Sequence, residues 1–220
     1  MDNRILEILL DSFWKIALPG LTMTIPLTIL SFTIGLFIAL IVAMIQVSNI
    51  KVLKQIVKGY VWIIRGTPLL VQLYVIFYGL PSLGILLEPF PAALIVFSLS
   101  IGAYDSETIR AAIEAIPKGQ FEAGYCVGMS YIQILFRIVL PQALRSAFPP
   151  LSNSLISLVK DTSLASNITI LEMLMATQRI IARTYEPFAL YCEVGLIYLI
   201  ICTILSKIQH VLENRFKLEY

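Results

Sequence analysis

The chain has 220 residues, of which 58% are hydrophobic and only 14% charged, and this balance excludes an ordinary soluble domain. A net charge of +2 gives no basic surface of the kind that binds nucleic acid. Three cysteines (Cys126, Cys192, Cys202) lack a C-x-x-C spacing, so we interpret them as small buried hydrophobic residues. The chain is therefore expected in a lipid bilayer.

The first 15 residues predict a short amphipathic helix that lies at the membrane interface. Its apolar residues recur near helical spacing, with acidic residues between them: Ile5, Leu6, Leu9, Leu10 and Phe13. We expect no cleaved signal peptide, because no basic stretch precedes a small-residue cleavage site. Residues 16–45 carry no charge and exceed the roughly 20 residues that cross a bilayer core, so they hold the first span. Pro19 and Gly20 predict its outer end.

The next segment predicts a cytoplasmic loop followed by a distorted span. Residues 46–59 contain Lys51, Lys54 and Lys58, and lysine-rich loops stay on the cytoplasmic side. The second apolar run, residues 60–80, is interrupted by the sequence RGTP. Gly66 loosens a helix there, and Pro68 removes a backbone donor and disfavours helix in the residue before it. We expect a kinked or partly unwound span.

Three further spans follow, which makes five in all. Residues 81–91 lack Lys and Arg and predict an external loop, and residues 90–104 form a span that continues as a charged helix to Pro117. The fourth span, residues 138–159, is expected to bend at Pro141, Pro149 and Pro150. Residues 162–178 predict an external or re-entrant helix rather than a sixth span, and residues 188–205 form the last span.

Lys and Arg are more numerous on the side that this topology makes cytoplasmic, so we place the N-terminus outside and the C-terminus inside. The predicted fold is all-α and integral to the membrane: an interfacial helix over residues 1–15, one five-span domain over residues 16–210 and a cytoplasmic tail over residues 211–220.

One polar stretch, residues 119–141, carries strong local order. Ser130 followed by Gln133 forms an S-x-x-Q capping box, which predicts a helix, a turn and a new helix from Tyr131. The stretch also holds the pattern Glu-Ala-small, Gly and Ile-x-Leu-Pro: Glu122, Ala123, Gly124, Gly128, Ile138, Leu140 and Pro141. This pattern resembles the EAA loop of ABC importer permeases, which implies cytoplasmic coupling helices that dock into an ATP-hydrolysing subunit. Gly124 stands where that family usually has a second Ala, and glycine weakens a helix by about 0.5–1 kcal/mol.

Longer segments extend the resemblance from about Thr22 to the end of the chain: RGTPLLVQLYVIFYGLP, AYDSETIRAAIEAIPKGQFEAGYCVGMS and LPQALRSAFPPLSNSLISLVKDTSLAS. They resemble the permeases of polar amino acid ABC importers, and YGLPSLGI, SLVKDTSLAS and LSKIQHVLENR look most like cystine permeases. The resemblance implies a bacterial cytoplasmic membrane protein that pairs with an identical or related permease subunit. It also implies an ATPase subunit and an external amino-acid-binding protein as partners.

The sequence contains no G-x-x-x-x-G-K-[ST] motif, so ATP and Mg²⁺ are expected on the partner and no cofactor on this chain. Its single histidine, His210, and the lack of an Asp/Glu/His cluster predict neither a metal site nor enzymatic activity.

Polar side chains within the predicted spans are candidates for a substrate path, because such residues are costly in lipid. Arg65 and Gln72 are seven positions apart and would share a helix face. A second stripe has spacings of four: Asn153, Ser157 and Asp161. The other interpretations are hydrogen bonds that only hold helices together, and an Arg65 that snorkels to the interface. A self-sufficient channel or secondary transporter for a small polar solute, and a non-transporting scaffold, remain the alternatives to an importer.

Overall fold

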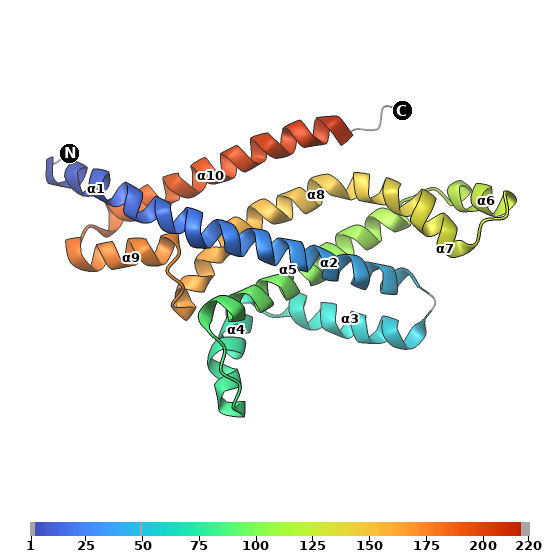
Figure 1. The fold of residues 1–220 in the computed structure, drawn as a ribbon, viewed down its shortest axis with the longest axis horizontal. Helices are drawn as coiled ribbons and strands as arrows, with labels where there is room; N and C mark the ends of the chain where they lie inside the picture. Colours follow the sequence, from blue (N-terminus) through green and yellow to red (C-terminus); the bar gives the residue numbers. More distant parts are fainter. Residues whose placement is uncertain (1–2, 49, 217–220) are drawn as a thin grey trace.

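The computed structural model describes residues 3–48 and 50–216, which fold into helices joined by short turns, with no strand among them. Figure 1 shows an elongated bundle. The N-terminus and α9 (Met173–Thr184) lie at one end, and α6 (Lys118–Cys126) and α7 (Tyr131–Ile134) lie at the opposite end. Residues 217–220 of the expected tail lie outside the described residues, and its preceding residues belong to α10 (Pro187–Phe216).

The N-terminal helix is not a separate element. α1 (Asn3–Pro19) continues through a π-helical turn (Gly20–Thr24) into α2 (Ile25–Val47), so no break in the helix marks the boundaries predicted near residue 15 and at Pro19, and these stay predictions. Pro19 keeps helical dihedral angles (φ −55°, ψ −32°), and the π-turn absorbs the distortion, because Ile25 N–H bonds to the Gly20 carbonyl.

The buried face of α1 packs against α9 and α10. Ile16 is fully buried in a cluster with Met173 and Leu190. Within the same contact, Ser12 Oγ donates a hydrogen bond to Glu193 Oε2 at 2.5 Å. Part of the apolar surface predicted for the lipid interface therefore covers protein.

The segment that contains Lys51, Lys54 and Lys58 is helical, whereas the sequence predicted a loop. α3 (Lys51–Gly66) starts three residues after Ser48, and its buried face includes Val57 and Val61. Its chain then bends by 106° into α4 (Leu69–Tyr74), which continues as a π-turn (Val75–Gly79) and a 3-10 turn (Leu80–Leu83). The predicted break at Pro68 is confirmed: Pro68 takes an extended ψ of 137°.

α5 (Pro89–Glu114) is the central helix, and α2 lies along much of its length. Two glycines permit this close approach. A Cβ atom on Gly35 would lie 2.6 Å from Ile101 Cβ, and one on Gly102 would lie 2.5 Å from Ile38 Cγ2. Small residues at such crossings are characteristic of helix packing in membranes.

α8 (Leu140–Asp161) follows a π-turn (Leu135–Val139) and packs on α5 and α10. Pro141 lies in its first turn, and the helix continues through Pro149 and Pro150 without a break.

Within the described residues, three helices are long and apolar enough to cross a membrane, namely Arg4–Val47, Pro89–Glu114 and Pro187–Asn214, and the bent α3–α4 pair makes up to four. α8 is not among them, because its sequence includes many polar residues, Gln142, Arg145 and Asn153 among them. A fifth span through α8 remains a prediction.

After α8, a 3-10 turn (Thr162–Ile168) leads to α9, whose 12 residues are too short to cross a core of about 30 Å. This agrees with the expected external or re-entrant helix. Glu172 is fully buried and caps α9 by accepting from Leu174 N–H (2.9 Å) and Met175 N–H (2.7 Å), and Tyr198 Oη of α10 donates to it at 2.9 Å.

Glu172 predicts a pH-dependent stability. Burial raises the pKa of this carboxyl above its ordinary value of 4.5, against the lowering effect of its three hydrogen bonds. The pKa of Glu172 is higher in the folded state than in the unfolded state, so the protonated carboxyl favours folding. Its contribution to the free energy of unfolding is complete below about pH 4.5 and is lost as the pH rises through the folded-state pKa. We expect Glu172→Gln to flatten this decline in thermal unfolding profiles recorded in detergent. Glu7→Gln, which changes an exposed glutamate, is the control. Equal slopes for Glu172→Gln and the unmodified protein would contradict the prediction.

Candidate coupling face and polar network

Gly128 ends α6 by adopting a left-handed conformation, with φ of 79°. Gly128 N–H bonds to the Tyr125 carbonyl at 2.9 Å, and Met129 N–H bonds to the Gly124 carbonyl at 3.0 Å. This pair of bonds is a Schellman motif, which reverses the chain after a helix. Glycine is favoured at Gly128 because other L-residues are strained at this φ.

The predicted capping box at the start of α7 is confirmed. Ser130 Oγ accepts from Gln133 N–H at 3.4 Å, and Gln133 Oε1 accepts from Ser130 N–H at 2.9 Å. The two helices are thus joined by a short turn whose backbone groups are bonded on both sides.

Gly124, which stands where the related pattern usually has a second Ala, is buried inside this pair. A Cβ atom at Gly124 would lie 2.5 Å from Ile134 Cγ1, so the small residue admits α7 of the same chain. Phe121 stacks on Tyr131 with ring centroids 6.1 Å apart. α6 and α7 therefore pack directly against each other through side chains.

The outer surface of this pair carries a group of exposed side chains. Glu122 and Ala123 are exposed, and Glu122 has no ion pair or hydrogen bond among the described residues. Four large apolar side chains between residues 125 and 136 are exposed as well: Tyr125, Val127, Ile132 and Phe136. We call these six residues the coupling face. Exposed apolar residues grouped around a charge are typical of a protein–protein contact.

The coupling face is tied to the core of the bundle. Ile134, Leu135 and Val139 are buried in one cluster with Ala39 of α2 and Ile109 of α5. Because packed interiors transmit displacement, a force on α6 and α7 would reach α2, α5 and α8.

Gly128→Ala should loosen the turn between α6 and α7, since a left-handed conformation costs roughly 1–2 kcal/mol for a residue with a Cβ. We expect faster hydrogen exchange at the amides of residues 124–129. Gly119→Ala is the control, because its Cβ would meet no atom within 4 Å and it lies in the first turn of α6. Unchanged exchange in Gly128→Ala would show that the turn does not depend on glycine.

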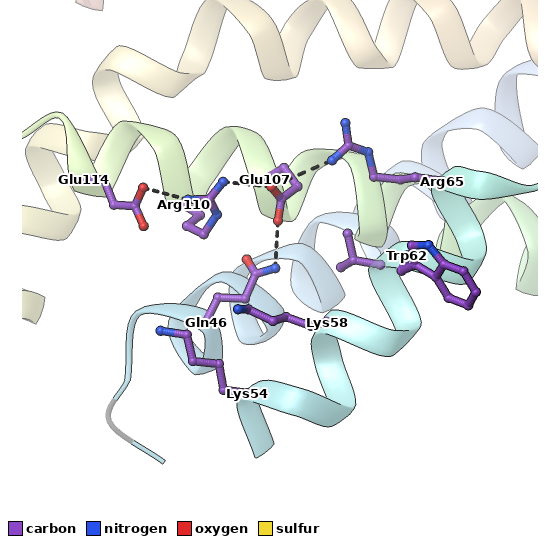
Figure 2. Close-up of a pocket in the computed structure, with 9 residues that line it drawn as sticks. Gln46, Lys54, Lys58, Trp62, Arg65, Glu107, Arg110 and Glu114 are labelled. Carbon is purple, nitrogen blue, oxygen red and sulfur yellow. Dashed lines mark hydrogen bonds and ion pairs between the residues drawn. The ribbon is translucent and has the colours of Figure 1, made fainter. Parts of the chain in front are cut away.

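A charged network lies farther along α5, facing α3 (Figure 2). Glu107 is at its centre: Arg110 approaches within 2.8 Å, Arg65 within 3.7 Å, and Gln46 Nε2 donates at 2.7 Å. Arg110 also bonds to Glu114 at 2.6 Å. The network joins α2, α3 and α5 near the end of the bundle that carries the coupling face.

Arg65 and Gln72 do not share a face, which corrects the sequence prediction, because the 106° bend separates them. Arg65 points toward α5, where its guanidinium lies 5.3 Å from the centre of the Tyr104 ring. Gln72 Nε2 turns back and donates to the carbonyls of Ile64 (2.8 Å) and Thr67 (3.1 Å). It therefore satisfies backbone groups that the break at Pro68 leaves open.

The second predicted stripe, on α8, makes its contacts elsewhere. Asn153 Oδ1 accepts from Gln209 Nε2 of α10 at 3.2 Å, Ser157 is exposed, and Asp161 is half-buried at the end of α8. The interactions of these side chains do not join the stripe to Arg65. A path lined by both stripes stays a prediction.

Sequence reasoning missed two acidic residues of α5. Glu107 is the centre of the network just described, and Asp105, only 1% exposed, accepts from Ser154 Oγ of α8 at 2.6 Å. The spacing of Glu107 and Arg110 by one helical turn was an available signal for the first. Nothing local indicates the partners of Asp105.

Comparison with known proteins extends the resemblance over most of the chain. The family described as "Binding-protein-dependent transport system inner membrane component" matches residues 31–218. The chain is 51% identical over 210 residues to "L-cystine transport system permease protein TcyB" of Bacillus subtilis, with 95% of this chain and 90% of that protein covered. It is 37% identical over 213 residues to "Nopaline transport system permease protein NocM" of Agrobacterium fabrum, with coverage of 92% and 88%.

The fold gives the same result. A solved structure described as "Crystal structure of an amino acid ABC transporter with histidines" superimposes with a TM-score of 0.89 and 33% identity, and covers 98% of this chain and 100% of that one. The predicted resemblance to ABC importer permeases is confirmed. The chain belongs to the family of inner membrane components of binding-protein-dependent transport systems.

Proposed function

We propose that this chain is the membrane-spanning subunit that carries L-cystine through an ABC importer. Identity of 51% with an L-cystine permease supports this substrate, whereas the nopaline permease is more distant at 37%. Cystine is a polar amino acid with two zwitterionic ends, and it needs a polar route through lipid. Arg65 and the α8 residues Asn153, Ser157 and Asp161 are candidates for that route. Gln72 is a weaker candidate, because its amide is engaged by the backbone.

The coupling face is where the ATPase subunit that drives transport would bind. Glu122, Ala123 and the apolar residues around them dock a separate ATPase subunit, which holds ATP and Mg²⁺, while Gly124 and Gly128 shape the helix pair. Closure of the ATPase subunits displaces α6 and α7, and the shared core passes this displacement to α2, α5 and α8. The break at Gly66 and Pro68 is the point in the chain most suited to bending.

The partners and orientation follow from this docking. The coupling face and Lys51, Lys54 and Lys58 face the cytoplasm, whereas the N-terminus and α9 face outward, where an amino-acid-binding protein delivers substrate. The start of α1 and the end of α10 lie toward opposite ends of the bundle (Figure 1), as expected for five spans. A second permease subunit, identical or related, completes the path.

The test is to purify the chain in mild detergent from native membranes, identify the proteins bound to it, and reconstitute the complex with labelled L-cystine. A co-purifying P-loop ATPase and ATP-dependent cystine uptake are expected. Uptake by the chain alone without ATP would favour a channel or secondary transporter. ATP-dependent uptake of another amino acid would leave the importer intact and change its substrate.

A further inference from the structure

The charges of α3 form one stripe along the helix. Lys51, Lys54, Lys58 and Arg65 follow one another at intervals of three, four and seven positions, so they lie on one side. Val57 and Val61 occupy the neighbouring face, which is buried against the bundle. The stripe therefore runs along the edge where α3 meets the rest of the protein.

A cavity of about 450 Å³ lies at this edge, between α3, α5 and the end of α2. Figure 2 shows Lys54 and Lys58 extending from α3 beside Gln46. Four cationic side chains line the cavity (Lys54, Lys58, Arg65, Arg110), and two carboxylates do so (Glu107, Glu114). The cavity thus carries an excess of positive charge.

Both carboxylates of the cavity already form ion pairs with arginines. Glu107 pairs with Arg110 and Arg65, and Glu114 pairs with Arg110. Lys54 and Lys58 have no carboxylate within 4 Å in the part of the chain that the structure describes. Two unpaired ammonium groups on successive turns, beside a cavity, are suited to an anion.

The surroundings of the cavity indicate a lipid rather than a soluble anion. Trp62 lines the cavity and is 77% exposed, a position typical of tryptophan at a membrane surface. Beyond it, Val52, Ile56 and Ile63 form an exposed apolar stripe on α3. Passing round the helix, a ligand would meet ammonium groups, then an indole ring, then a surface suited to acyl chains.

We propose that this cavity binds the phosphate of an acidic phospholipid, with Lys54 and Lys58 as its ligands and the acyl chains along the exposed face of α3. Basic pockets between membrane helices bind acidic lipid headgroups in this way. A bound lipid would hold α3 against α5 at the Glu107 network. The proposal does not depend on the transported substrate.

The experiment uses the full chain in nanodiscs of phosphatidylglycerol and phosphatidylcholine, with retained lipids counted by native mass spectrometry. Phosphatidylglycerol should be retained selectively. In Lys54→Gln/Lys58→Gln its affinity should fall about 30-fold, because each lysine near a membrane surface contributes about fivefold. Lys118→Gln/Lys207→Gln removes two exposed lysines that lie outside α3 and do not line the cavity, and it should bind as the unmodified protein does. Lys54→Arg/Lys58→Arg should retain the lipid, which separates loss of charge from loss of fold.

Several results would overturn the proposal. Equal retention of the two lipids would remove the selectivity, and unchanged affinity in Lys54→Gln/Lys58→Gln would exclude these ligands. Displacement of phosphatidylglycerol by millimolar inorganic phosphate would assign the site to a free anion. Displacement by L-cystine would assign it to the transport path.

Discussion

Glu122→Lys should release the ATPase subunit from the complex and reduce ATP-dependent uptake to background, while the chain stays folded in the membrane. Glu122 is an exposed residue of the coupling face and has no ion pair or hydrogen bond among the described residues, so its substitution breaks no such bond within the chain. At an interface, loss of one member of a charge pair costs about 2–5 kcal/mol, which weakens binding by roughly 30-fold or more. Charge reversal adds repulsion to this loss. Retention of the ATPase on affinity-purified permease, and uptake into proteoliposomes, measure the effect.

The matched control is Glu88→Lys, which reverses an exposed glutamate at the start of α5. This variant should retain the ATPase as the unmodified protein does. A third variant, Phe136→Ala, removes an apolar side chain of the same face and should weaken retention without any change of charge. Normal retention and uptake in Glu122→Lys would exclude the coupling role of this face.

The local features of the fold could be predicted from the sequence because their causes lie within a few residues. Pro68 breaks a helix through its own ring and missing N–H, and Ser130 and Gln133 cap a helix by bonding to each other's backbone. Hydrophobic runs likewise mark helices that cross lipid. The pattern around Glu122 predicts coupling helices through resemblance, while the exposed position of Glu122 follows from the structure.

Features that depend on distant partners could not be predicted in this way. Gln46 and Glu107 are 61 residues apart, so no local pattern joins them. The lysines of α3 are compatible with a loop or with an amphipathic helix, and only packing against α5 decides between the two. Gly124 is a further example. Helix propensity alone predicts that this glycine destabilises α6, whereas the contact with Ile134, which is ten residues away, requires a residue without a side chain at this position.

The polar residues of α5 lie between the broken α3–α4 pair and the polar stripe of α8, the two regions that the proposed mechanism uses. Glu107 faces α3 at the network, and Asp105 faces Ser154 of α8, one residue from Asn153. A displacement of α5 therefore reaches the broken α3–α4 pair on one side and the predicted substrate stripe on the other. This helix also packs along α2, so we expect its fit against α2 to matter for the proposed mechanism as well as for stability.

Gly35→Ala adds only one methyl group, but we expect it to destabilise the protein strongly. The new Cβ would lie 2.6 Å from Ile101 Cβ and 2.9 Å from the Ser98 carbonyl oxygen, and neither a β-branched carbon nor a backbone atom of a helix can move aside easily. Overpacking of a close-packed interior costs about 1–3 kcal/mol. We expect a lower thermal unfolding midpoint in detergent and a comparable loss for Gly102→Ala at the same helix pair.

Gly195→Ala is the matched control, because its Cβ would meet no atom within 4 Å on an exposed face of α10 and alanine favours a helix. If Gly35→Ala were as stable as Gly195→Ala, α2 and α5 would not approach as closely as the structure places them, and the transmission of movement from the coupling face through α5 would lose its physical basis.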